Sequence, residues 1–268
     1  MKKTTCRLMK PRTWLVLCLP LLMAWPVDAA HVILTDGRRM EGSAIRARAN
    51  GDVILSTPRG DLTFARGQYS EAWAPRPREI DQARQQMQAG NHEQVISILE
   101  GVVSQYRHLG WDNEAMVMIG RAQNNLGQYS SALSTFQRLF QNAPGRREDS
   151  NVRWAFYRSM LGAGELDRLE RDLNELIKDG ERADAARAQV MRGDIKMQRD
   201  LAEAAVLDYL RTVVLFSAQA DVQAEALYKA GVALQAMRDE RANEMFRKVV
   251  RDHAQSPYAR QARERLGS

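Results

Sequence analysis

Three patterns of hydrophobic and polar residues follow one another along the 268-residue chain. Residues 14–25 form an uncharged run behind a basic start. Short runs of β-branched residues, separated by polar turns, follow as far as about residue 75. From about residue 79 onward, hydrophobic residues recur three or four positions apart, the spacing of amphipathic helices. These patterns predict a leader over residues 1–29, a small β-module over residues 30–75 and a helical array over residues 76–268.

The first part has the three features of a secretory signal peptide: a basic start, a short apolar core and small residues at its exit. Cleavage is expected near Ala29 or Ala30, which predicts a periplasmic or secreted protein with no membrane span after cleavage. A spanning helix needs about 20 apolar residues, and Pro20 interrupts this run. The alternatives are an uncleaved anchor and a lipid attached at Cys18, although Leu17 stands where lipid-attachment signals have a small residue.

Removal of the leader changes both the charge and the cysteine content. The whole chain has a formal net charge of +6, and residues 1–29 contain five Lys or Arg and one Asp, so the remainder is near +2. Nucleic-acid-binding domains usually keep a strong basic excess, so no nucleic-acid partner is predicted. Cys6 and Cys18 both lie in the leader, and the mature chain is therefore expected to lack disulfides and cysteine-bound metals.

The β-module is predicted from two turn signals between short β-type runs. Asp36-Gly37 and Asn50-Gly51 supply the positive φ angles of tight hairpin turns, and four or five strands fit the segment. Residues 32–64, with an Asp-Gly-Arg motif followed by Gly42, resemble small SH3-like or Sm-like barrels. The resemblance implies a barrel-like module. Such a module would bind a peptide or glycan, cap the array, or contact another copy.

The helical part contains a repeating arrangement of small and aromatic residues. Gly120 is followed by Ala132 after twelve residues and by Phe136 after four more, and Pro144 comes eight residues later. Small residues allow the two helices of a unit to approach closely, the aromatic ring fills the space between repeats, and the proline ends the second helix. The same order recurs at two places further along, Gly193/Ala205/Tyr209 and, with one residue missing, Gly231/Ala242/Phe246.

Five units begin near residues 76, 113, 150, 186 and 224. Their arrangement resembles the tetratricopeptide repeat family, whose standard unit has about 34 residues. The last unit, with Ser256-Pro257 before another helix, is similar to repeats of bacterial envelope proteins. The resemblance implies a mainly α protein, an α–α superhelix of about five repeats behind the β-module. The third unit matches poorly, which leaves open whether the superhelix is continuous.

The resemblance also implies a concave groove, lined by the first helix of each pair, that binds partner proteins. Three arginines occupy the same position in successive units, and a guanidinium makes two-pronged contacts with carboxylates. Solvated arginines and a tryptophan in the inter-helix core are the alternative interpretation. The candidate partner-binding residues are Arg84, Arg121, Asn124, Asn125, Trp154 and Arg158.

No catalytic, metal-binding or cofactor-binding motif is recognised. The acid-rich residues 165–175 alternate with arginines, which is typical of a solvated helix face. If cleavage fell after Ala30, His31 would be the N-terminal residue and could chelate copper, but the sequence indicates no second histidine to join it. The histidines are too far apart in sequence for a zinc motif: His31, His92, His108 and His253.

The sequence therefore predicts an exported, non-enzymatic scaffold or adaptor that mediates protein–protein interactions in the cell envelope. Its partners would be other envelope proteins or their peptide segments, and a homo-oligomer is possible on the same architecture. Two alternatives stay open, a self-assembling structural protein and an accessory subunit of an envelope glycan-processing complex. Nothing in the sequence names the partner.

Overall fold

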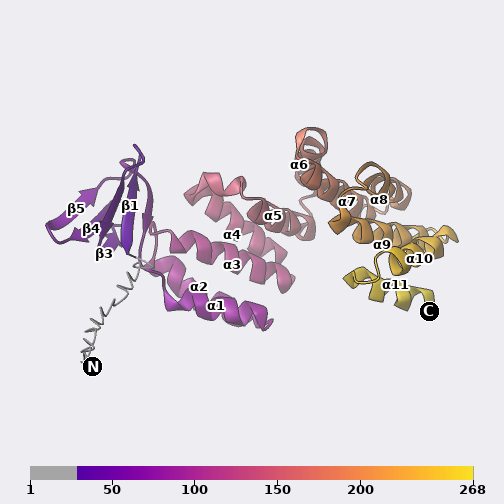
Figure 1. Cartoon of the computed structure of the whole chain (residues 1–268), viewed down its shortest axis with the longest axis horizontal. Helices are drawn as coiled ribbons and strands as arrows, with labels where there is room; N and C mark the ends of the chain where they lie inside the picture. Colours follow the sequence, from indigo (N-terminus) through magenta and orange to yellow (C-terminus); the bar gives the residue numbers. More distant parts are fainter. Residues whose placement is uncertain (1–28, 268) are drawn as a thin grey trace, which may run out of the picture. The chain divides into compact units, whose positions relative to one another are not determined.

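The computed structural model describes residues 29–267 (Figure 1). The predicted leader and its two cysteines lie outside the described residues, apart from Ala29. Contacts within the chain divide it into two units, and the division falls between Arg76 and Pro77. Each unit is described separately below.

The first unit consists of two three-stranded antiparallel sheets, with strand orders β2-β1-β6 and β3-β4-β5. Gly37 and Gly51 have φ angles of 85° and 89°, as the two turn signals predicted. The strands are β1 (Ala30–Leu34), β2 (Arg39–Gly42), β3 (Ala44–Ala47), β4 (Val53–Thr57), β5 (Gly60–Phe64) and β6 (Tyr69–Trp73).

The sheets differ from the expected barrel in two respects. No pairing closes them into a barrel in the described residues, and there are six strands rather than four or five. The additional strand, β6, pairs with β1 so that Ala72 lies opposite Val32. Its sequence, Tyr-Ser-Glu-Ala-Trp, buries only the alanine, so it lacks the apolar alternation that identifies a strand.

Gly42 explains how the two sheets come close together. A β-carbon at this position would lie 2.5 Å from the backbone oxygen of Ser56 and 2.8 Å from the Leu55 side chain. Only glycine tolerates such an approach of one backbone to another. Val32 of one sheet and Val53 and Leu55 of the other are fully buried, and they form the small core of this unit.

The second unit is a series of antiparallel helix pairs. Consecutive helices pack on one another along the series, as expected for a tetratricopeptide-like solenoid. The helices are α1 (Arg78–Gln88), α2 (His92–Gln105), α3 (Trp111–Asn125), α4 (Tyr129–Asn142), the 3-10 helix η1 (Pro144–Arg147), α5 (Ser150–Ala163), α6 (Leu166–Asp179), α7 (Arg182–Gln198), α8 (Ala202–Leu215), α9 (Ala220–Ala236), α10 (Arg241–Asp252) and α11 (Pro257–Gly267).

The small residues of the repeat let the paired helices approach closely, as predicted, and the aromatic rings lie against the glycines within each pair and not only between repeats. A β-carbon on Gly120 of α3 would lie 2.7 Å from the Phe136 ring of α4. Gly231 of α9 has the same relationship to Phe246 of α10, at 2.6 Å. Both rings are fully buried, so the glycines permit the close contact within each helix pair.

The poorly matching third unit does not interrupt the packing. One apolar cluster runs from Met116 of α3 through Phe156 of α5 and Leu169 of α6 to Ile195 of α7. A second cluster begins at Val190, also on α7, and continues to Ala262 of α11. Because α7 contributes to both clusters, the array is continuous through the third unit.

The last helix begins as its sequence predicted. The Ser256 hydroxyl oxygen accepts a hydrogen bond from the backbone N–H of Tyr258 at 3.2 Å, and Pro257 is the first helical residue. Both features are typical of helix starts. Among residues 29–267, no helix has the length and hydropathy needed to cross a membrane.

Candidate protein-binding surface

The predicted site residues lie on α1, α3 and α5, the first helices of the first three pairs. Asn124 and Asn125, although adjacent, face opposite environments. The Asn124 amide nitrogen donates to the Ala155 backbone oxygen at 2.8 Å, and its side-chain oxygen accepts from the Ser159 hydroxyl at 2.9 Å. Asn124 is buried, so its polar groups join α3 to α5 and are not accessible to a partner.

Asn125 and Arg158 are exposed and contact each other across the same two helices. Arg158 Nη1 donates to Asn125 Oδ1 at 3.1 Å. Arg121, one helical turn before Asn125, is also exposed and forms no ion pair with any residue in the range 29–267. The structure therefore brings together Arg121, Asn125 and Arg158 on one surface.

Trp154 belongs to the contact between α5 and α7. It is 8% exposed, its Nε1 donates to Asp184 Oδ1 at 3.0 Å, and its ring lies edge-on to Tyr157 with centroids 5.7 Å apart. Arg153 forms an ion pair with the same Asp184. The indole is thus a packing residue in this structure and leaves little surface for a partner.

Arg187 of α7 extends the exposed surface and was not among the predicted residues. Its guanidinium carbon lies 4.8 Å from the centroid of the Trp154 ring. This cation–π contact orients the guanidinium group. Arg187 has no acidic partner in the described part of the chain. Arg187 is the second residue of the fourth unit, which starts near Ala186. Its place in the repeat was therefore the sequence signal that could have identified it as a groove residue.

Arg84 of α1 is exposed as well and forms no ion pair among the described residues. The arginine series ends at the fourth pair, where the equivalent position is Asp194. We refer to Arg121, Asn125, Arg158 and Arg187 as the arginine surface. Its guanidinium groups lack carboxylate partners within residues 29–267.

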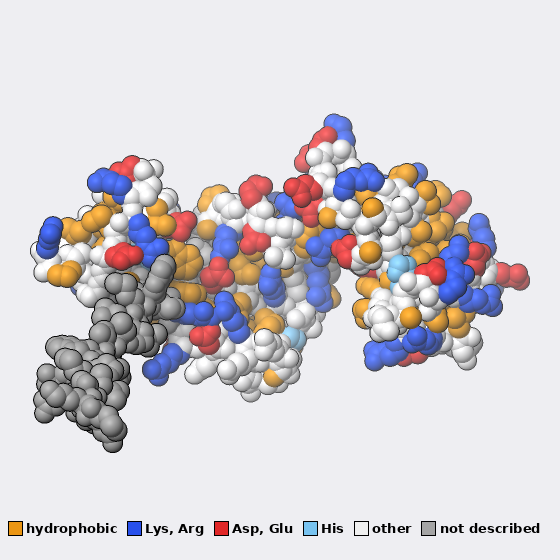
Figure 2. Space-filling view, in the orientation of Figure 1, with side chains coloured by type: hydrophobic (Ala, Val, Ile, Leu, Met, Phe, Trp, Pro, Cys, Tyr) orange, Lys and Arg blue, Asp and Glu red, His pale blue; other side chains and the backbone are white. Residues whose placement is uncertain are grey.

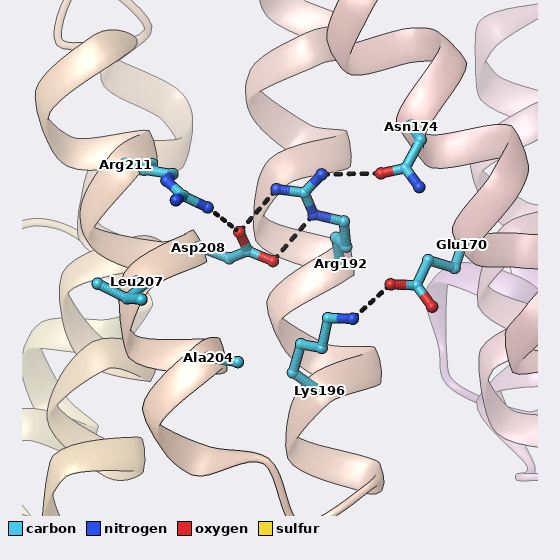
Figure 3. Close-up of a pocket in the computed structure, with 8 residues that line it drawn as sticks. All are labelled: Glu170, Asn174, Arg192, Lys196, Ala204, Leu207, Asp208 and Arg211. Atoms are coloured by element: carbon cyan, nitrogen blue, oxygen red, sulfur yellow. Dashed lines mark hydrogen bonds and ion pairs between the residues drawn. The ribbon is translucent and has the colours of Figure 1, made fainter.

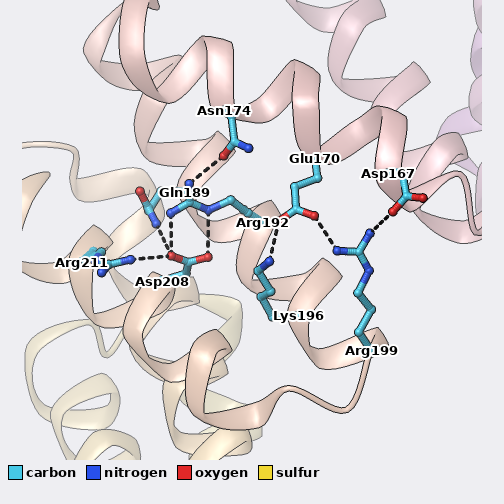
Figure 4. Close-up of polar contacts among 9 residues, drawn as sticks. All are labelled: Asp167, Glu170, Asn174, Gln189, Arg192, Lys196, Arg199, Asp208 and Arg211. Atoms are coloured by element: carbon cyan, nitrogen blue, oxygen red, sulfur yellow. Dashed lines mark hydrogen bonds and ion pairs between the residues drawn. The ribbon is translucent and has the colours of Figure 1, made fainter.

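Cations between α6, α7 and α8 are neutralised by acids. Arg192 of α7 contacts Asp208 of α8 through two nitrogens, at 2.7 and 2.9 Å, and also donates to Asn174 of α6 at 2.7 Å (Figure 4). Lys196 donates to Glu170 at 2.5 Å, and this hydrogen bond holds the pKa of Glu170 below its ordinary value.

These ion pairs line a pocket of ≈ 240 Å³ between α6, α7 and α8 (Figure 3). Its two carboxylates, Glu170 and Asp208, are both occupied by cations. A general acid or base needs a carboxyl group free to exchange a proton with a substrate. The pocket therefore has the organisation of a structural ion-pair network.

A second, partly buried network lies between α7, α8 and α9. Burial raises the pKa of Asp194, although Lys229 contacts it at 2.7 Å and the Tyr209 hydroxyl donates to it at 2.8 Å. A shifted pKa is a feature of many active sites but also of structural networks. Every member here has a partner inside the array, which favours the structural role. No group of His, Cys, Asp and Glu in the described chain is arranged to hold a metal ion.

Sequence comparison identifies the helical repeat. Residues 114–145 and 225–256, which cover most of the second and fifth helix pairs, match the tetratricopeptide repeat family. These two segments match tetratricopeptide repeats, within an array of helix pairs of the same kind. Repeat arrays of this kind mediate protein–protein interactions, so the fold implies protein partners. No curated protein matches this sequence.

Solved structures show similarity over about two thirds of the chain. A kinesin light chain protein of Podospora anserina with nearly identical TPR-like repeats is 16% identical, with 66% of this chain and 95% of that chain covered and a TM-score of 0.52. MamA of Desulfovibrio magneticus RS-1 is 17% identical, with 67% and 95% covered and a TM-score of 0.49. At this level of identity the first likeness concerns the fold alone.

Proposed function

We propose that this protein is an exported, non-enzymatic scaffold that binds other proteins of the cell envelope through the arginine surface and Arg84. The leader pattern over residues 1–29 supports export to the periplasm or beyond. The tetratricopeptide repeats support a role in protein binding. The paired carboxylates of the pocket between α6 and α8 give no support to catalysis there.

The observation that carries the proposal is the contrast between two sets of cations. Arg192, Lys196 and Arg199 are neutralised by acids of the array, whereas the arginines at positions 121 and 187 are exposed without a carboxylate partner in residues 29–267. A guanidinium recognises a carboxylate through two parallel hydrogen bonds. The partner segment would therefore be extended and would carry acidic side chains along its length.

The test is affinity capture from envelope extract with the wild-type chain and with a triple variant, Arg84→Glu, Arg121→Glu and Arg158→Glu. The expected result is that a defined set of proteins bound by the wild type is lost from the variant while its helical content is unchanged. A matched control reverses three exposed arginines on second helices of the pairs, Arg138, Arg171 and Arg247. Equal loss from both triple variants would contradict the proposed site.

Export is tested separately by mass spectrometry of the chain recovered from its producing cells. We expect the mature N-terminus at Ala30 or His31, and recovery in the periplasmic or secreted fraction. A chain that keeps residues 1–29 and remains in the cytoplasmic fraction would overturn the export proposal without affecting the test of the arginine surface.

A further inference from the structure

Helix α8 presents an apolar side to solvent. Six large hydrophobic side chains are exposed among the described residues, and four of them lie on α8 or directly before it. Orange side chains are visible over this helix in Figure 2. The four are between 48% and 71% exposed, an unusual concentration for a single surface helix: Leu201, Leu207, Val214 and Leu215.

The exposed positions of α8 form one stripe with a regular composition. Glu203, Leu207, Arg211 and Val214 follow at intervals of four, four and three residues, so they lie on one side of the helix. All four are exposed. Leu207 and Arg211 also border the pocket between α6 and α8, where they lie one turn apart (Figure 3).

The charges of this stripe are placed symmetrically about Leu207. Glu203 lies four residues before it and Arg211 four residues after it. Glu203 forms no ion pair within residues 29–267. Arg211 donates one N–H to Asp208 at 3.2 Å, and its side chain stays 54% exposed, so other donors of the guanidinium remain accessible.

We propose that a second copy of this chain covers the stripe, through an antiparallel contact between the two α8 helices with its two-fold axis at Leu207. In that arrangement each Leu207 meets its equivalent, and each Glu203 faces the Arg211 of the other copy. Leu201, before the helix, would cover the Val214 of the second copy. A two-fold interface requires a self-complementary surface, and opposite charges at equal distances from one apolar residue meet that requirement.

The symmetry favours a second copy over an unrelated helix. A different partner would need only complementary charges, with no relation between the positions of Glu203 and Arg211. A single helix pair forms a small contact, at the lower end of specific interfaces, so the dimer is expected to be weak and to depend on protein concentration. The arginine surface takes no part in this dimer, so the dimer is independent of the proposed scaffold function.

The first measurement is the mass of the purified chain by sedimentation velocity over a wide concentration range. We expect the average mass to rise with concentration toward twice that of the monomer. The variants Glu203→Arg and Arg211→Glu place like charges opposite each other in a homodimer, and each alone should remain monomeric. An equimolar mixture of the two should dimerise again, because every facing pair is then opposite in charge.

The mixing result separates the two-fold arrangement from other ways of covering α8. Recovery of the dimer only in the mixture supports the antiparallel register. A wild-type chain that stays monomeric at all concentrations overturns the proposal, and so does a dimer that persists in both single variants. The latter result would mean that another surface joins the copies.

A further pair of variants avoids the buried carboxylate beside Arg211. Leu207→Lys changes only the exposed centre of the stripe and should abolish the dimer, because two ammonium groups would then meet at the axis. Met237→Lys changes another exposed hydrophobic side chain, at the end of α9, and should leave the dimer unchanged. Equal effects of the two substitutions would overturn the proposed location.

Discussion

The ring of Tyr209 occupies the space in which a side chain of Gly193 would otherwise lie. A β-carbon on Gly193 of α7 would be 2.4 Å from Cε1 of Tyr209 on α8. The ring is buried, and its hydroxyl donates to Asp194, the residue after the glycine. The missing side chain therefore permits both the close packing of the two helices and the buried hydrogen bond.

This relationship predicts that Gly193→Ala destabilises the array. The added methyl group has to displace a fully packed ring, and overpacking of this kind costs about 1–3 kcal/mol. Gly101→Ala is the matched control, because a β-carbon at that position of α2 meets no atom within 4 Å. There the gain in helix propensity should stabilise the protein by about 0.5–1 kcal/mol. Urea denaturation of both variants measures the difference, and equal effects would contradict the packing argument.

The sequence was sufficient to predict where paired helices approach closely, because that approach depends on residue size and spacing. The distances along the chain from Gly120 to Phe136 and from Gly193 to Tyr209 are both sixteen residues, and each pair meets in the structure. Such contacts follow from helix geometry, which repeats from one pair to the next. Strand β6 was missed because its composition does not alternate, although pairing with β1 suffices to form it.

The candidate site was less predictable because neighbouring positions face different surroundings. The repeat frame assigned both Asn124 and Asn125 to the groove, yet only Asn125 is exposed. Trp154 is enclosed by Asp184 and Arg187 from another helix, a contact that depends on side-chain orientation. The repeat pattern predicts which side of a helix a residue lies on. Tertiary contacts then decide which residues on that side stay accessible.

We expect Asn124→Ala to destabilise the protein by about 1–3 kcal/mol, since two hydrogen bonds between α3 and α5 would be lost. The Ser159 hydroxyl would still have the Ala155 carbonyl as an acceptor, at 3.0 Å. The adjacent Asn125→Ala removes an exposed contact with Arg158 and should change stability by less than about 0.5 kcal/mol. Chemical denaturation compares the two. A loss at position 125 as large as that at position 124 would contradict the inward orientation of Asn124.

Two carboxyl groups of α6 should respond to pH in opposite directions. The hydrogen bond from Lys196 lowers the pKa of Glu170, so this group contributes stability that is present above its unfolded pKa of about 4.3 and is lost as the pH falls through the folded pKa. We therefore expect Glu170→Gln to cost about 1–2 kcal/mol at pH 7 and progressively less as the pH falls below the unfolded pKa. The free energy of unfolding, measured at pH 7 and at stepwise lower pH, provides the measurement.

The contribution of Asp172, on the same helix, should depend on pH in the opposite direction. Burial raises its pKa, so the folded state disfavours the charged form, and stability is lost as the pH rises from the unfolded pKa through the folded pKa. Asp172→Asn should therefore be more stable than the wild type at pH 7 and should lose this advantage in acid. If Asp172→Asn and Glu170→Gln changed stability with the same sign at pH 7, the direction of the pKa shift given for one of the two carboxyl groups would be wrong.

The final prediction concerns the contact between Arg192 and Asp208, whose carboxylate is 4% exposed (Figure 4). Among residues 29–267, Arg192→Met leaves that carboxylate with Gln189 and Arg211 as its remaining partners. The substitution should cost about 2–3 kcal/mol in thermal or chemical unfolding. Arg211→Ala removes a mostly solvated partner and should cost less than about 1 kcal/mol. Adding Asp208→Leu to Arg192→Met should restore much of the loss, since replacing both buried charges removes the need to desolvate them. If the double variant were as unstable as Arg192→Met alone, the cost would lie in lost side-chain packing rather than in an unpaired carboxylate.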